Sequence, residues 1–310
     1  MPNRYQCNYV NNPQCIGGCN RDDRHKIAES DVCSITSSII DGLPIRCVGE
    51  WAEQKIYLLT QYFGIFAQGM SIKWKGKINY IEICSGPGKC VNRSERTEFD
   101  GTALSIVNRD EFKYVNKALF FDINELVVST LNQRLSSINA INAKAFIGDY
   151  TNPETICSVL RTELSRDSLN LVVIDPTDCS VPFDSIACIK RTIPRMDLLI
   201  NVAVGTDYNR NIRNTLLQPA QYTRTIQKYC SFLGDNHFYE RIHKNDSDKD
   251  LRRAFLSSYE QKLNSIGFAF FANGSVENYY YILFASQSQK GLEFWNKATK
   301  YDYVGQGSLF

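Results

Sequence analysis

Residues 266–286 read IGFAFFANGSVENYYYILFAS, two runs rich in aromatic and branched residues that are separated by the hexapeptide NGSVEN. Runs of this length and composition are typical of β-strands, and Asn-Gly between two such runs favours a tight hairpin. The two strands of a hairpin pair antiparallel. The sequence therefore predicts an antiparallel pair of strands late in the chain.

Five short apolar runs precede this hairpin, and longer amphipathic stretches separate most of them. Such alternation predicts βαβ units, and therefore a parallel sheet with helices on both faces. A parallel sheet finished by an antiparallel hairpin is the plan of class I methyltransferases, so we expect an α/β, Rossmann-like fold of this class. The predicted strands are INYIEIC (78–84), KALFFDI (117–123), AKAFIG (143–148), LNLVVID (169–175) and MDLLINV (196–202).

The chain divides into three parts. Residues 1–76 form a Cys-bearing extension and an amphipathic helix that begins near Gly49, and we interpret the helix face that includes Lys55 as packing. Residues 77–288 form a methyltransferase-like domain, with an insertion at about 207–247 that we interpret as a lid or substrate-side segment. Residues 289–310 form a C-terminal tail.

Charge and hydropathy exclude some classes of protein. With 35 Lys and Arg against 33 Asp and Glu, the 310-residue chain is nearly neutral, so overall charge does not favour a polyanionic partner. No run approaches the roughly 20 apolar residues that span a bilayer, and the N-terminus lacks a secretory pattern. We expect a cytoplasmic protein with no membrane partner. An odd number of cysteines, 11, favours reduced thiols over a disulfide framework.

The first predicted strand runs into a glycine-rich turn, YIEICSGPGKC (80–90). A phosphate-binding P-loop needs a hydroxyl residue where Cys90 stands and a glycine where Ile83 stands, so an NTPase is excluded. A dinucleotide site wants a third glycine where Val91 stands, so support for NAD is weak. If the turn holds a methyl donor instead, Lys89 is expected in the first turn of a helix and not as a phosphate ligand.

The turn fits S-adenosylmethionine better. This ligand asks for an acid in the strand, close glycines that let the backbone approach its amino-acid moiety, and acids at the ends of the following strands. Glycine turns also serve chain reversal alone, and acids at strand ends also cap helices, so the structural interpretation stays open. The candidate cofactor-binding residues are Glu82, Ser85, Gly86, Gly88, Asp122 and Asp149.

The fourth predicted strand ends in VVIDPTD (172–178), beside the crevice where open α/β sheets bind ligands. IDPTD resembles the Asp-Pro-Pro-aromatic motif of amino-group methyltransferases, in which a carboxylate and a backbone carbonyl hold the target amine while an aromatic ring stacks on a flipped base. Asp178 stands where that ring would be, and Phe183 is the nearest substitute. The candidate catalytic residues are Asp175, Pro176 and Asp178.

The N-terminal extension holds enough soft ligands for a tetrahedral zinc site. Its spacings include no Cys-x-x-Cys, so a structural zinc and free thiols in a loop both stay open. The candidate ligands are Cys7, Cys15, Cys19 and Cys33.

Longer segments match, in order, a bacterial and phage family. They are DGLPIRCVGEWAEQKIYLLTQYFGIF (41–66), YIEICSGPGKC (80–90), DGTALSI (100–106), VVIDPTDCSVPF (172–183), DLLINVAVGTDYNRNI (197–212), YYILFASQSQKGLEFWNK (280–297) and GQGSLF (305–310). On these segments the chain resembles the three-Cys-motif partner proteins. The resemblance implies a class I methyltransferase-like fold and association with a separate, radical-SAM-like protein that carries a three-cysteine motif. The chain departs from the family in having Asp178 where a glycine is usual.

Two hypotheses for function compete. The first is a methyltransferase dependent on S-adenosylmethionine, with nucleic acid as one substrate class because KWKGK (73–77), NRSER (92–96) and NRNIRN (209–214) form basic loops. The second is a non-catalytic partner or recognition subunit in a bacterial or phage defence cassette. Aromatic residues expected at the surface support the second hypothesis, namely Tyr208, Tyr222, Tyr229, Phe238 and Tyr239.

Overall fold

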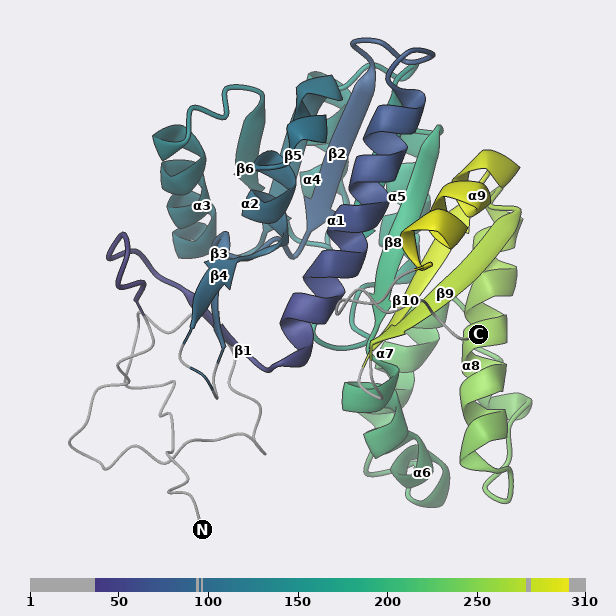
Figure 1. Ribbon diagram of the computed structural model, residues 1–310. Coiled ribbons are helices and arrows are strands. Elements are labelled where there is room, and N and C mark those ends of the chain that lie inside the picture. The colour runs from purple at the N-terminus through teal and green to yellow at the C-terminus, as the bar shows by residue number, and fades with distance from the viewer. Residues whose placement is uncertain (1–36, 93–94, 96, 277–279, 301–310) are drawn as a thin grey trace, which may run out of the picture.

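The computed structural model describes residues 37–92, 95, 97–276 and 280–300 (Figure 1). The strands are β1 (Arg46–Val48), β2 (Ile78–Ile83), β3 (Lys89–Asn92), β4 (Glu98–Asp100), β5 (Val115–Asp122), β6 (Ala143–Ile147), β7 (Leu169–Ile174), β8 (Met196–Val202), β9 (Phe270–Val276) and β10 (Tyr280–Ser286). The α-helices are α1 (Trp51–Met70), α2 (Thr102–Val107), α3 (Glu125–Ser137), α4 (Glu154–Glu163), α5 (Phe183–Thr192), α6 (Asn209–Leu217), α7 (Thr223–Leu233), α8 (Asp248–Ser265) and α9 (Gln289–Ala298). Short helical turns are η3 (Asp110–Tyr114), η4 (Val204–Tyr208) and η5 (Phe238–Glu240).

The main sheet has seven strands in the order β6-β5-β2-β7-β8-β10-β9. From β6 to β8 each neighbouring pair is parallel, whereas β10 pairs antiparallel with both β8 and β9. An open parallel sheet that ends in this reversed strand is the class I methyltransferase fold. The predicted fold class is therefore confirmed, and the five predicted parallel strands lie within two residues of the observed ones.

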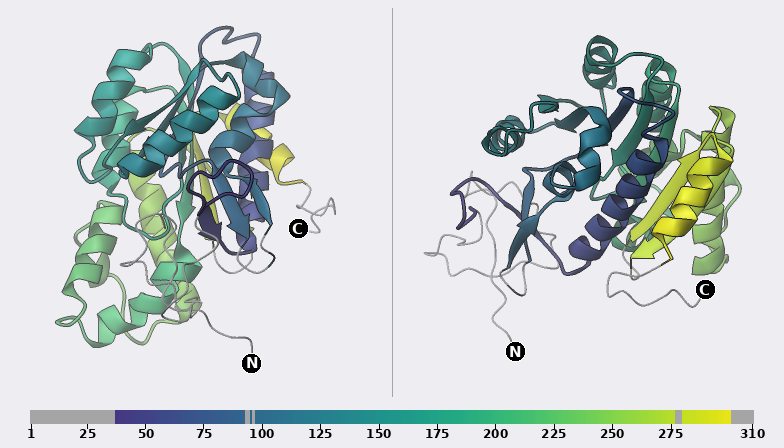
Figure 2. Two further views of the ribbon diagram at one scale, coloured as in Figure 1. Left: turned by 90° about the vertical axis from the view of Figure 1, so that its left-hand side faces the viewer. Right: turned by 45° about the horizontal axis from the view of Figure 1, so that its top comes forward.

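Helices cover both faces of the sheet (Figures 1 and 2). Side chains alternate between the two faces of a strand, so Tyr80 of β2 joins one buried cluster and the adjacent Ile81 joins the other. The first cluster unites the sheet with α1, α2, α3 and α9. The second unites it with α4, α5, α7 and α8. The central strands are buried on both faces, which explains their continuous apolar sequences.

Helix α9 lies in the segment predicted as a tail, and it packs on α1 and the hairpin. Trp295 is 1% exposed, and its ring stacks on Phe284 of β10 with 5.3 Å between centroids. The same indole lies 5.9 Å from the ring of Tyr62 in α1. Residues 289–298 therefore form part of the core rather than a free tail.

The C-terminal hairpin is confirmed, but its predicted turn is misplaced. Asn273 and Gly274 pair with Leu283 and Ile282, so they lie inside β9. Packing explains the glycine, because a Cβ at Gly274 would lie 2.9 Å from Cδ2 of Leu58 in α1. The residue thus makes room for a helix instead of turning the chain.

The chain after the glycine turn also differs from the prediction, since Lys89 begins a strand and not a helix. β3 pairs parallel with β1 and antiparallel with β4 in a second sheet of order β1-β3-β4. The Gly101 amide donates to the Gly88 carbonyl at 2.7 Å, which closes this excursion, and only then does α2 begin. Lys89 Nζ faces Asp100 Oδ1 at 3.5 Å across the hairpin.

The segment 207–247 folds into helices that belong to the core. The rings of Tyr208 and Tyr229 are fully buried with centroids 5.4 Å apart, and Phe238 is 1% exposed. The Tyr208 hydroxyl donates to the Leu251 carbonyl at 2.9 Å, which ties the segment to α8. The expectation of a surface aromatic cluster is therefore wrong for these three residues.

The four candidate zinc ligands, Cys7, Cys15, Cys19 and Cys33, lie outside the described residues. Across the described ranges, no group of three or more His, Cys, Asp or Glu side chains is arranged to hold a metal ion. Within the same ranges, no helix is long and apolar enough to cross a membrane.

Candidate functional site

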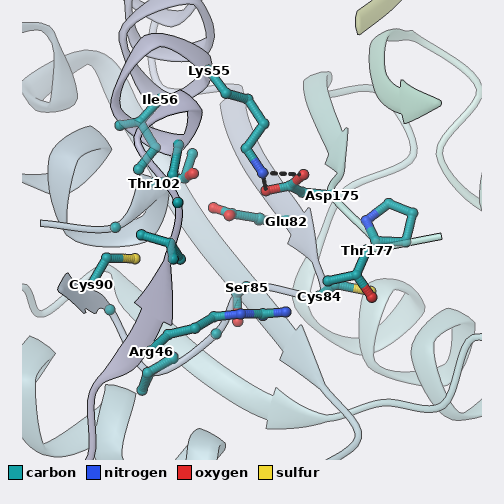
Figure 3. Close-up of a pocket in the computed structure, with 18 of the residues that line it drawn as sticks. Arg46, Lys55, Ile56, Glu82, Cys84, Ser85, Cys90, Thr102, Asp175 and Thr177 are labelled. Carbon is teal, nitrogen blue, oxygen red and sulfur yellow. Dashed lines mark hydrogen bonds and ion pairs between the residues drawn. The ribbon is translucent and has the colours of Figure 1, made fainter. Parts of the chain in front are cut away.

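A cleft opens at the carboxyl ends of β2 and β7, where the first turns of α1 and the small sheet face the glycine turn (Figure 3). Ligand crevices of open α/β sheets form at this edge, because the strand ends and the loops that follow them converge there. The predicted residues that line this cleft are Glu82, Ser85, Gly86, Gly88, Asp175 and Pro176.

The backbone of the turn takes left-handed conformations at every second residue. The φ angles are +67° at Cys84, +66° at Gly86 and +91° at Gly88. Such angles suit glycine and are uncommon for other residues, so Cys84 is held in a conformation that favours glycine. Cβ at Gly88 would lie 2.9 Å from Leu131, whereas the nearest atom to one at Gly86 is Arg46 Nη1 at 3.7 Å. The turn is therefore closed by packing at Gly88 and more open at Gly86.

Ser85 presents an unsatisfied hydroxyl in this turn. Its Oγ is buried and has no hydrogen-bond partner among the described residues. The Ser85 amide donates to the Phe121 carbonyl at 3.1 Å, so the backbone is fixed while the hydroxyl is left over. A buried polar atom without a partner is uncommon, and one that lines a cleft is suited to contact a ligand.

Glu82 lies beneath the cleft and is 1% exposed. The Tyr80 hydroxyl donates to Glu82 Oε2 at 2.9 Å. Burial raises the pKa of Glu82 to about 8, although the hydrogen bond from Tyr80 opposes the shift. The carboxyl group is therefore mostly protonated near neutral pH, and a cationic ligand group would favour its ionised form.

Asp175 is held by a lysine from α1. Lys55 Nζ lies 2.7 Å from Oδ1 and 2.6 Å from Oδ2 of Asp175, and the Asn201 amide donates to Oδ1 at 2.9 Å. Burial by itself lowers the pKa of Lys55, but the Asp175 carboxylate raises it, and the net shift is upward. The lysine is therefore charged and compensates the carboxylate.

Pro176 contributes its backbone to the same network. Its carbonyl accepts from the Asn201 amide at 3.1 Å. The side-chain oxygen of Asn201 is buried and has no partner among the described residues. Asn201 thus fixes both the carboxylate of Asp175 and the carbonyl that the sequence motif assigned to the target amine.

Arg46 of β1 extends across the glycine turn beside Ser85 (Figure 3). Its side chain lines the cleft and is half-buried, and its guanidinium makes no hydrogen bond or ion pair with another described residue. A guanidinium in a cleft offers a planar pair of donors to a carboxylate or phosphate. Arg46 therefore supplies the cleft with a positive charge that no carboxylate of the described residues pairs with.

Asp122 and Asp149 do not line the cleft as described. Asp122 accepts from the Gly86 amide at 3.3 Å and the Asn124 amide at 3.0 Å, so it lies directly behind the turn. Asp149 accepts from the amide and hydroxyl of Thr151, both at 2.7 Å. Neither carboxylate caps a helix, since the N-cap residues of α3 and α4 are Asn124 and Pro153. Both carboxylates instead accept hydrogen bonds from nearby turns, and each keeps further lone pairs.

Asp178 is turned toward α7. Its Oδ2 lies 3.3 Å from Lys228 Nζ, and the same lysine approaches Asp207 Oδ2 at 2.6 Å. Asp207 is buried and accepts from the Cys179 amide at 2.9 Å and the Tyr229 hydroxyl at 3.1 Å. Asp178 thus belongs to a polar network that anchors α7, and it is absent from the described lining of the cleft.

Two aromatic rings line the cleft, and neither was predicted to do so. Trp51 and Tyr280 lie 6.2 Å apart between centroids, and Lys55 Nζ lies 5.2 Å from the Tyr280 ring centre. Phe183, the substitute proposed from sequence, is 3% exposed and packs against Gly234 and Tyr259, so it does not reach the cleft.

No family model matches the chain, and no curated protein sequence matches it. Solved structures do show a general likeness. A Legionella pneumophila protein matches with a TM-score of 0.45 at 11% identity, over 83% of this chain and 95% of that one. The magnesium protoporphyrin IX methyltransferase of Synechocystis, with SAH bound, matches with a TM-score of 0.36 at 13% identity, over 76% of this chain and 86% of that one. EvdMO1 matches with a TM-score of 0.39 at 11% identity, over 74% of this chain. The match covers 42% of the length of EvdMO1. The fold assignment itself rests on the strand order and pairing.

Proposed function

We propose that the cleft binds S-adenosylmethionine and that the chain is a methyltransferase. The amino-acid end of this cofactor carries a carboxylate and an ammonium group. Arg46 and the Ser85 hydroxyl, neither with a described partner, are suited to the carboxylate, and Glu82 is suited to the ammonium group. The unpartnered Ser85 hydroxyl beside the open backbone of Gly86 is the observation that carries the proposal.

The adenosine end is assigned to the acids that follow β5 and β6. Asp122 lies behind Gly86 and keeps lone pairs for ribose hydroxyls, and Asp149 stands at the next strand end for the adenine amino group. When bound, the cofactor supplies an activated methyl group on a sulfonium sulfur.

The residues around Asp175 are suited to orient an acceptor more than to deprotonate it. Lys55 and Asn201 already hydrogen-bond to the carboxylate, so fewer of its lone pairs are open to a proton of the acceptor. Trp51 and Tyr280 offer faces on which a planar acceptor can stack, and they shield the cleft from water. Holding the two reactants in the right geometry and excluding water can supply a large part of the rate enhancement of methyl transfer.

Isothermal titration with S-adenosylmethionine and with adenosine tests the binding site. Arg46→Gln should weaken the binding of S-adenosylmethionine by roughly tenfold or more, because a charged hydrogen bond is lost. It should leave the affinity for adenosine unchanged, because adenosine lacks the carboxylate. Arg252→Gln on the exposed side of α8 is the matched control and should change neither affinity. Folded wild-type protein that binds neither ligand would exclude the proposal.

A second candidate function is a non-catalytic, ligand-binding subunit that works with another protein, such as the three-Cys-motif, radical-SAM-like partner implied by the family resemblance. The observation that favours it is the saturation of the Asp175 carboxylate by Lys55 and Asn201. The two functions separate when the protein is incubated with methyl-labelled cofactor and fractionated bacterial DNA, RNA and protein. Label that enters one fraction and is lost with Asp175→Asn supports catalysis, whereas cofactor binding with no label in any fraction supports the subunit.

A further inference from the structure

A basic surface lies at the amino ends of the parallel strands, the end of the sheet opposite the cleft. The loop between α1 and β2 marks this end at the top of Figure 1. Two backbone hydrogen bonds bring the adjoining loops together, since the Leu169 amide donates to the Lys77 carbonyl at 2.9 Å and the Asn170 amide donates to the Arg195 carbonyl at 3.0 Å. The entries to β2, β7 and β8 are therefore neighbours.

Three arginines surround a hollow on this surface. Arg161 lies in the last turn of α4, Arg191 lies in the last turn of α5, and Arg166 lies in the loop before β7. Arg161 pairs with Glu154, whereas the guanidinium of Arg191 makes no ion pair or hydrogen bond with any residue that the structure describes. All three side chains are exposed, so the guanidinium groups are available to a ligand.

A second group of cations continues from Arg166 toward β2. Arg195 Nη1 lies 2.8 Å from Asp167 Oδ1, and its guanidinium lies 5.8 Å from the centre of the Trp74 ring. The hydrogen bond from Arg195 lowers the pKa of Asp167, and the charges of Lys77 and Arg166 lower it further. Three cations therefore gather around one carboxylate.

The charge of this basic surface is unbalanced. Five cations and two carboxylates, Glu154 and Asp167, give this surface a local charge of +3. This local charge is larger than the formal net charge of the whole chain, +2. The nearby Glu163 is compensated by Lys117 at 2.6 Å. The cations of the surface are Lys77, Arg161, Arg166, Arg191 and Arg195.

Helix capping explains only part of this arrangement. Cations in the last turn of a helix stabilise its C-terminus, which accounts for Arg161 and Arg191. Lys77, Arg166 and Arg195 lie outside α-helices, so that reason does not apply to them. The three-arginine hollow alone would be enough to bind a ligand with a single phosphate. The second group of cations extends the positive charge across the entries to three strands, which suits a longer anion.

We propose that this basic surface binds the phosphate backbone of a nucleic acid. Arginine forks match phosphate oxygens in pairs, and successive phosphates would follow the line from Arg191 through Arg166 to Arg195. A six-residue strand such as β7 is about 20 Å long, so the basic surface and the cleft are separate sites. The inference is independent of methyl transfer.

Fluorescence anisotropy with labelled 20-nucleotide single strands and duplexes, measured over a range of NaCl concentrations, tests the proposal. The variant Arg161→Gln/Arg166→Gln/Arg191→Gln should bind at least tenfold more weakly than wild type at about 100 mM salt, and its slope of log affinity against log salt should be smaller by about 2. The control Lys249→Gln/Arg252→Gln/Arg253→Gln removes three exposed charges from α8 and should keep the wild-type slope.

Three results would overturn the proposal. The first is no oligonucleotide binding at about 50 mM salt by folded wild-type protein. The second is an equal loss in the α8 control, which would mean nonspecific charge attraction. The third is binding of tripolyphosphate without binding of any oligonucleotide, which would assign the hollow to a small phosphorylated ligand. Thermal melting of each variant, and its affinity for S-adenosylmethionine, verify that the fold and the distant cleft are intact.

Discussion

Lys55 of α1 forms a two-pronged contact with Asp175 at the end of β7, with distances of 2.7 and 2.6 Å to the two carboxylate oxygens. The pair joins a helix that precedes the sheet in sequence to the strand end where ligands of such sheets bind. Both side chains are about one-seventh exposed, at 14% and 13%. The contact is therefore a structural element of the cleft and places a cation beside its carboxylate.

Replacing one partner of this pair should lower the free energy of unfolding more than replacing both partners. Lys55→Met leaves a mostly buried carboxylate without its cation and should lower the free energy of unfolding by about 3 kcal/mol. The double variant Lys55→Met/Asp175→Asn should recover a large part of that loss, because no unpaired charge remains. Urea denaturation of wild type, both single variants and the double variant measures the coupling. Strict additivity of the two single effects would show that the pair is not energetically coupled.

The affinity for S-adenosylmethionine should depend on the ionisation of Glu82. Because burial raises the pKa of Glu82 to about 8, binding of an ammonium group requires loss of a proton below that pH. Affinity should therefore rise with pH by up to about tenfold per unit and stop rising near pH 8, where Glu82 is ionised and the α-amino group of the ligand itself begins to lose its proton. Titrations from roughly pH 6 to 9 measure the profile.

Glu82→Gln is the control for this profile. The amide keeps an acceptor for the Tyr80 hydroxyl but cannot ionise, so its affinity should be weak and independent of pH. A wild-type profile that falls between pH 6 and 8, or a variant that keeps the wild-type slope, contradicts the assignment of the ammonium group to Glu82.

Trp295 should be essential for stability although it lies in the predicted tail. Trp295→Ala removes a buried indole between α1 and β10, so the loss should be about 3–5 kcal/mol. Lys297→Ala on the exposed side of the same helix should change stability by less than about 0.5 kcal/mol. Thermal and urea unfolding measure both. Equal, small effects would mean that α9 does not pack as described.

Asp178→Gly introduces the glycine that sequence analysis expects at this position. Asp178 is 41% exposed and faces Lys228, so the lost ion pair should be worth no more than about 1 kcal/mol. Because Asp178 does not line the cleft, affinity for S-adenosylmethionine should stay within about twofold. A large change in that affinity would return Asp178 to the ligand site.

The parallel strands were predictable because each is a short apolar run buried on both faces, and alternation of such runs with helices leaves few topologies. The glycine turn was predictable for a similar local reason, since Gly86 and Gly88 adopt angles that favour glycine. Local patterns were therefore sufficient to find the fold and one wall of the cleft.

Contacts between distant segments were not predictable from one sequence. Lys55 and Asp175 are 120 positions apart, and on the helix face Lys55 appeared as a packing residue. Arg46 lies in a three-residue strand without apolar periodicity, and Tyr280 reaches the cleft only through the position of β10. The Asn273-Gly274 pair led to a correct prediction of the hairpin but a wrong position for its turn. The glycine is needed because Leu58 of α1 leaves no room for a side chain there.

A crystal structure of the protein with S-adenosylhomocysteine tests the central claim most directly. The proposal predicts the carboxylate of the ligand within hydrogen-bond distance of the Arg46 guanidinium and the Ser85 hydroxyl, with its ribose toward Asp122. Ligand density elsewhere on the molecule, or an occupied cleft in which Arg46 and Ser85 contact no ligand atom, would contradict it.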